Sequence, residues 1–187
     1  MNSTDFVHLA IAALGGKVHG RTSLQKKVYF LGLLTDSLPE LGYRPHFYGP
    51  YSDEVSAAVA DLRAVGYIQE DVQSAGTHDN AGFERRVYDY KLTDAGSRVA
   101  ASKAVQSAEL WAKLQAGASV LSRAGEQNYM KLSVAAKTYF LRGQKQTAVS
   151  DSELADLAKR FGWNVSPAEV REAASYLTSL GLLSQPA

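Results

Sequence analysis

The strongest constraint on the fold is a helix signal that runs through a single glycine into two strand signals. Ser52 is a good N-cap residue. Apolar side chains then recur at helical spacing, at Val55, Ala58, Val59, Leu62 and Val65. Gly66 is placed to end that helix, because the position after a helix favours glycine. Residues 67–72 and 83–92 have strand composition on either side of a polar, glycine-rich stretch. This pattern predicts a helix that leads directly into a β-hairpin with a long tip.

Two more helices are predicted before this one. Residues 4–14 carry an apolar stripe and are followed by two glycines, and a second helix opens at Thr22. Thr22 to Gln25 fits a capping box, in which the Gln25 amide reaches back to the Thr22 amide. Residues 15–22 between the two helices are interpreted as a turn. Three helices followed by a hairpin is the element order of a winged helix, which residues 1–98 fit.

The remaining chain is predicted to be helical. A helix capped at Thr93 is expected to continue through Leu114 and to belong to a connecting helix, residues 99–128. Residues 129–187 are expected to form a C-terminal helical, winged-helix-like domain, in which Ser166 starts the last helix. The predicted fold class is mainly α with a small β-hairpin (α+β). The apolar connecting helix could form a homodimer or could dock the two domains together.

Composition excludes several classes of protein. The 187 residues include no cysteine, so disulfide frameworks, Cys-containing zinc sites and thiol nucleophiles are ruled out. No apolar run approaches the length of a membrane span, and the first residues lack the basic region of a secretory signal. We therefore expect a cytoplasmic protein without membrane contact. A net charge of +1 argues against coating nucleic acid through bulk electrostatics.

Two segments carry a resemblance to known proteins. Residues 22–31, Thr-Ser-Leu-Gln-Lys-Lys-Val-Tyr-Phe-Leu, and 47–55, Phe-Tyr-Gly-Pro-Tyr-Ser-Asp-Glu-Val, resemble the YwgA-like family of bacteria and archaea. They resemble the Panacea antitoxin domain more distantly, because the second half of the chain departs from that pattern. The resemblance covers about residues 17–95. It implies a winged-helix-like fold and a role in gene regulation, toxin neutralisation or phage defence, and it brings no catalytic residues.

A cluster of cations near the second helix is the first candidate site. Lys17, His19, Arg21, Lys26 and Lys27 lie within eleven residues that contain no acid. Cations beside a helix N-terminus can hold an anion or a DNA phosphate. We therefore predict phosphate contacts from the four lysine and arginine side chains. The alternative is a solvated surface that only keeps the protein soluble.

The second candidate site is the arginine pair of the hairpin. Arg85 and Arg86 lie close to the predicted tip, where such side chains can enter the minor groove of DNA. Acidic neighbours on both sides weaken this interpretation. A cross-strand pairing with Glu70 or Asp71 uses the arginines equally well.

The third predicted helix is the one that should enter the major groove, yet it is acidic. It carries Asp53, Glu54 and Asp61 against Arg63 alone. Two hypotheses follow. The first is a DNA-binding regulatory or antitoxin-like protein that contacts duplex DNA through the cations above. The second is a non-enzymatic adaptor that uses the three acids to bind a protein such as a toxin or defence component.

The sequence offers no catalytic, metal or cofactor site. Its four histidines are scattered, and no Gly-x-Ser-x-Gly elbow is present. A dense aromatic set allows two interpretations, core packing of the proline-rich connector or an exposed recognition patch. Its members are Tyr43, His46, Phe47, Tyr48 and Tyr51.

Overall fold

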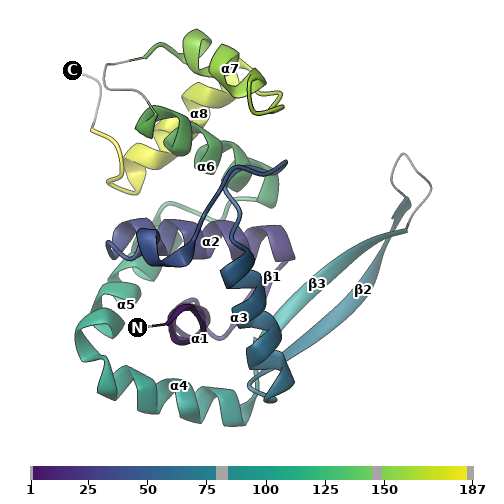
Figure 1. Cartoon of the computed structure of the whole chain (residues 1–187), viewed down its shortest axis with the longest axis vertical. Helices are drawn as coiled ribbons and strands as arrows, with labels where there is room; N and C mark the ends of the chain where they lie inside the picture. Colours follow the sequence, from purple (N-terminus) through teal and green to yellow (C-terminus); the bar gives the residue numbers. More distant parts are fainter. Residues whose placement is uncertain (1, 79–83, 145–148, 185–187) are drawn as a thin grey trace.

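The computed structural model describes residues 2–78, 84–144 and 149–184 of the chain (Figure 1). Within these ranges the structure has eight α-helices, one 3₁₀ turn and one three-stranded sheet. In chain order the elements are α1 Ser3–Ala13, β1 Lys17–His19, α2 Arg21–Leu34, η1 Leu38–Leu41, α3 Asp53–Ala64, β2 Ile68–His78, β3 Glu84–Leu92, α4 Asp94–Gln106, α5 Ala108–Arg123, α6 Tyr129–Gly143, α7 Asp151–Lys159 and α8 Pro167–Ser179. The predicted α+β class, mainly helical with a small amount of β-structure, is confirmed.

The sheet is antiparallel, and its strands lie in the order β1-β3-β2. Strands β2 and β3 form the predicted hairpin, with Ile68 opposite Leu92 at its base. The prediction that residues 15–22 are only a turn was wrong, because β1 pairs there with β3 and sets Val18 opposite Tyr90. A three-residue strand between glycines is too short to show a strand pattern in the sequence.

Local helix signals were accurate at the start and end of α3 and at the start of α8. The Ser52 hydroxyl accepts a hydrogen bond from the Val55 amide at 2.9 Å, and Gly66 follows α3 at φ +75°. Ser166 forms the expected capping box at the start of α8. The capping box predicted at Thr22 was wrong. Helix α2 begins one residue earlier, with Gly20 at its N-cap, and the Gln25 amide bonds elsewhere.

The helix predicted to continue through Leu114 is two helices, α4 and α5, which meet at Ser107. Figure 1 shows them passing around α1, which is seen nearly end-on. The bend lets both helices pack on α1, and their inner side chains are buried, including Ala100, Ala104 and Leu114. The apolar side of this segment is therefore packed within its own chain. The homodimer through it remains a prediction.

One hydrophobic cluster joins all three predicted segments. It includes Leu9 and Phe30 of the N-terminal helices, Leu114 of α5, and Leu132 and Leu177 of α6 and α8. A smaller cluster surrounds Trp163 between α6, α7 and α8. The main cluster therefore continues across residues 98 and 128, and the domain boundaries there remain a prediction. The described part of the C-terminal segment contains no strand. No described helix is both long and apolar enough to cross a membrane.

Candidate functional site

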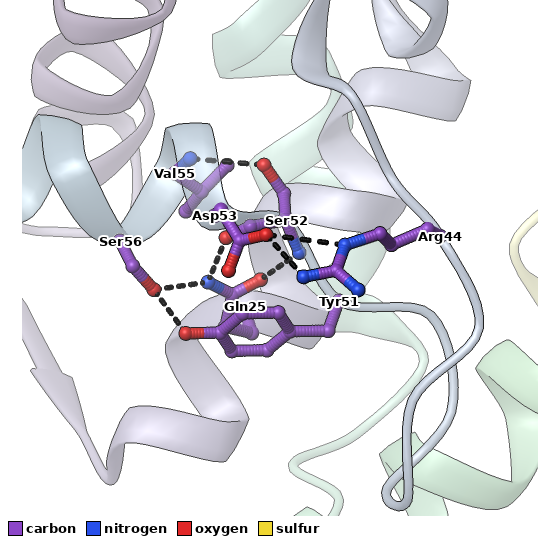
Figure 2. A network of polar contacts seen from close by, with 7 residues as sticks. All are labelled: Gln25, Arg44, Tyr51, Ser52, Asp53, Val55 and Ser56. Atoms are coloured by element: carbon purple, nitrogen blue, oxygen red, sulfur yellow. Dashed lines mark hydrogen bonds and ion pairs between the residues drawn. The ribbon is translucent and has the colours of Figure 1, made fainter.

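The segment between η1 and α3, residues 43–52, is named here the anchored loop. Its end is tied to α2 by Gln25 (Figure 2). The Gln25 amide nitrogen donates to the Ser52 carbonyl at 2.9 Å and to the Ser56 hydroxyl at 3.0 Å, and its oxygen accepts from the Ser52 amide at 3.1 Å. One buried side chain thus pairs with both backbone groups of Ser52, as a neighbouring strand would.

The next residue of α2 holds the middle of the loop. Lys26 is 1% exposed, and its ammonium donates to the Pro50 carbonyl at 2.5 Å. No carboxylate pairs with Lys26 within the described residues, and the buried Lys137 of α6 is also nearby. Burial, with a smaller effect from the positive charge of Lys137, lowers the pKa of Lys26 to about 7. The prediction that Lys26 contacts phosphate was wrong, because its place on the inner side of α2 encloses its amine against the loop.

The C-terminal helices hold the same loop from the other side. The indole nitrogen of Trp163 donates to the His46 carbonyl at 2.6 Å. Gly49 lies at φ +89° against α6, where an added Cβ would stand 2.9 Å from Lys137 Cγ and 3.2 Å from the Ser133 carbonyl oxygen. The loop backbone is therefore fixed by contacts from α2, from α6 and from the segment between α7 and α8.

The tip of this fixed loop is aromatic and exposed. Phe47 is 79% exposed and Tyr48 is 52% exposed. The exposed His46 ring contacts Phe47 and also Tyr51, with ring centroids 5.5 Å and 5.0 Å apart. Tyr43 at the other end is partly buried, and its hydroxyl donates to the Gln25 carbonyl at 2.7 Å. The aromatic set thus divides into a packed base and an exposed tip, so core packing accounts for only part of it, and a recognition role for the tip remains a prediction.

The three acids predicted to bind protein belong to α3, with Asp53 and Glu54 in its first turn and Asp61 near its end, and all three are exposed. Asp53 forms an ion pair with Arg44 of the anchored loop, as Figure 2 shows. Glu54 and Asp61 form no ion pair within the described residues. Arg63 of the same helix pairs with Glu70 of β2. The exposed side of α3, which begins directly after the anchored loop, is therefore acidic.

The predicted phosphate-binding cations are not brought together. Arg21 lies 4.1 Å over the Tyr88 ring and donates to the Tyr90 hydroxyl at 3.3 Å. The exposed Arg86 belongs to the same face of β3 as Tyr88, since strand residues two apart share a face. Lys17 belongs to the opposite face, because its neighbour Val18 is buried.

Lys27 and Arg85 are the remaining members of the predicted cation set. Lys27 lies 3.8 Å from Glu126, in a groove beside α5. Arg85 belongs to β3, but its side chain falls outside the described part of the structure. The alternative pairing with Glu70 is made by Arg63 of α3.

The sequence analysis missed the role of Gln25 and Lys26 as anchors of the loop. The available signal was the joint presence of the two motif segments, 22–31 and 47–55, which the structure shows to be in direct contact. Among the described side chains, no three histidine, aspartate or glutamate residues gather around one point.

Comparisons with known proteins give one partial relationship. No known family profile matches the chain, and no solved structure is similar to it. Over 82 residues the chain is 34% identical to the uncharacterized protein YwgA of Bacillus subtilis strain 168. The match covers 44% of this chain and 45% of YwgA, so the chain spans less than half of that relative. These figures support a YwgA-like relationship.

Proposed function

We propose that this chain is a non-enzymatic protein-interaction module on a winged-helix scaffold. Its interface consists of the Phe47 and Tyr48 side chains together with Asp53, Glu54 and Asp61. The observation that carries the proposal is the combination of an aromatic tip that faces solvent and a backbone held by buried polar contacts. Rigid aromatic side chains lose little conformational entropy on binding and are enriched at protein interfaces.

The charges on α3 indicate the chemistry of the partner that we propose. Glu54 and Asp61 have no cation of their own within the described ion pairs, and Arg63 is already paired with Glu70. A partner that offers an apolar pocket with a basic rim would complement this surface. The resemblance to antitoxin domains makes a toxin or another component of a bacterial defence locus the class of partner to test first.

The scaffold is part of the same proposal. The order helix, short strand, helix, helix, hairpin, with sheet order β1-β3-β2, agrees with the order expected of a winged helix. The acidic character of α3 disfavours its insertion into a major groove of DNA, so we propose that this helix contacts a protein partner.

The test is capture of the partner from the native host with tagged protein. Wild-type protein should retain a partner after nuclease treatment, and the double variant Phe47→Ala with Tyr48→Ala should lose it. The matched control is Val105→Ala, which removes an equally exposed apolar side chain on α4 and should retain the partner. Retention of the same partner by the double variant would sink the proposal.

DNA binding is the second candidate, and one observation favours it. Arg21 and Arg86 belong to the same side of the projecting hairpin, and Arg21 is held there by Tyr88 and Tyr90. The measurement is duplex affinity as a function of salt concentration, with Arg86→Ala as the variant. A phosphate contact predicts a salt slope smaller by about one in the variant. Absence of any shift on duplex DNA at low salt would eliminate this candidate.

A further inference from the structure

A concave region lies where α1, α5 and the connection between α5 and α6 meet. It is a groove of about 570 Å³ that shares no lining residue with the anchored loop. Its apolar lining includes Leu14, Ala118 and Leu121, and aromatic rings are supplied by Trp111 and Tyr176. Small-molecule sites have volumes of roughly 300–1,000 Å³ and combine apolar walls with a few polar groups. The groove has this size, and polar side chains such as Gln115, Ser122 and Glu126 line it beside the apolar ones.

One cation lines this groove. The Lys27 side chain is 23% exposed, and its ion-pair partner within the described residues is Glu126 at 3.8 Å. The Glu126 side chain is 88% exposed, and an ion pair at that distance with one partner in solvent contributes little. The Lys27 ammonium is therefore available to a second anion that enters the groove.

The aromatic residues also offer unused donors. Neither the Trp111 indole N–H nor the Tyr176 hydroxyl forms a hydrogen bond within the described residues. Both residues are partly buried against the main hydrophobic cluster. Each donor is therefore available to a ligand that reaches the edge of its ring.

We propose that this groove binds a small, flat aromatic anion, with its ring system against Trp111 and Tyr176 and its carboxylate or sulfonate on Lys27. The inference goes beyond the proposed protein interface and does not depend on it, because the two surfaces share no residue.

The first test uses a pair of fluorescent probes that differ in charge. 8-Anilinonaphthalene-1-sulfonate carries the aromatic body and the anion, and N-phenyl-1-naphthylamine carries the aromatic body alone. Titration into the full-length protein should give about tenfold weaker binding of the sulfonate probe to Lys27→Gln than to wild type. Binding of the neutral probe should be unchanged. Equal weakening of both probes, or no binding of the sulfonate probe to wild type, would overturn the proposal.

The second test distinguishes probe binding in this groove from probe binding in the neighbouring hollow. Ser119 lines the groove and Ser175 lines the hollow beside it, and both are exposed residues. Ser119→Phe should abolish binding of both probes, whereas Ser175→Phe should leave it unchanged. The opposite pattern would refute the assignment, as would loss of probe binding in the Phe47→Ala, Tyr48→Ala variant. The charge comparison at Lys27 remains decisive if Ser119→Phe fails to fold.

Discussion

The anchored loop and the β2–β3 hairpin both extend from the helical body, but they are held in different ways. Beyond the Val72–Tyr88 pair the hairpin is held mainly by its own ladder, and Gln73, Ser74 and Arg86 are exposed. Figure 1 shows it projecting away from the helices. The backbone pairing of the loop itself is limited to one bridge between Arg44 and Tyr51 and a turn bond from Gly49 to His46, and buried side chains from distant helices hold the rest of its backbone. The difference teaches that an irregular segment can be as firmly placed as a strand when its polar backbone groups find buried partners.

The largest expected effect concerns the buried amine. Because the pKa of Lys26 is about 7 when folded and about 10.5 when unfolded, the unfolded chain binds more protons between these values. The free energy of unfolding should therefore rise with pH, by about 3 kcal/mol between pH 7 and 9.5. Urea unfolding at the two pH values measures it. The upper limit stays below the range in which Tyr29 and Tyr43 oppose the trend, since burial raises the pKa of both.

Two variants separate Lys26 from other titrating groups. Lys26→Met should remove most of the rise, and the matched change Lys27→Met on the same helix should keep it. The buried Lys137, whose pKa is also lowered by burial, adds a smaller rise of the same sign. If the free energy of unfolding of Lys26→Met rose as much as that of wild type, the Lys26 amine would not be the source of the pH dependence.

The next effect compares two glycines with positive φ. Gly49→Ala places a Cβ against Lys137 and the Ser133 backbone, and should cost about 2–3 kcal/mol through strain and overpacking. Gly76→Ala in the hairpin has φ +65° with no atom near the new Cβ, and should cost only about 1 kcal/mol. Thermal unfolding of both variants measures the difference. Equal costs would mean that the loop does not pack firmly on α6.

A smaller contrast is expected between two glutamines. Gln25→Leu leaves the buried Ser52 backbone without its partner and should cost about 2 kcal/mol. Gln69→Leu replaces an exposed side chain on β2 and should change the free energy of unfolding by less than about 0.5 kcal/mol. Chemical unfolding of both variants provides the numbers. An effect of Gln25→Leu as small as that of Gln69→Leu would show that Gln25 does not hold the loop in place.

The smallest effect is expected at the loop tip. Phe47→Ala should leave the free energy of unfolding within about 0.5 kcal/mol of wild type, because most of the ring already faces solvent. The protein-interaction proposal requires this result, since the ring is assigned to binding. A loss well above 1 kcal/mol would instead make the ring a packing element.

The same contrast explains what could be predicted from the sequence. Some features depend on residues close together in the chain, namely the hairpin, the ends of the helices and the Ser52 cap. Composition and spacing therefore indicated them. The place of Lys26 depends on Pro50, and that of Gln25 on Ser52, so the sequence led instead to a phosphate contact for Lys26 and a capping box for Gln25. Strand β1 was missed for the same reason, because three residues become a strand only when β3 lies beside them.

For the candidate site, the sequence indicated the acids of α3. It also offered two interpretations of the aromatic set, core packing and an exposed patch. It could not divide the aromatic set into base and tip, because exposure is decided by the helices that pack around the loop. Nor could it separate Lys26 from Lys27, which differ by one helical step of about 100°. That step turns one amine into the interior and the other toward the groove beside α5.

The bond from Trp163 to the His46 carbonyl joins residues 117 positions apart. During synthesis the ribosome adds about 5–20 residues per second, so the loop waits on the order of ten seconds for this partner. The aromatic tip therefore acquires its final conformation only after most of the chain has been made. A nascent chain that lacks the C-terminal helices cannot display the completed surface, which would delay engagement of a partner until translation is nearly finished.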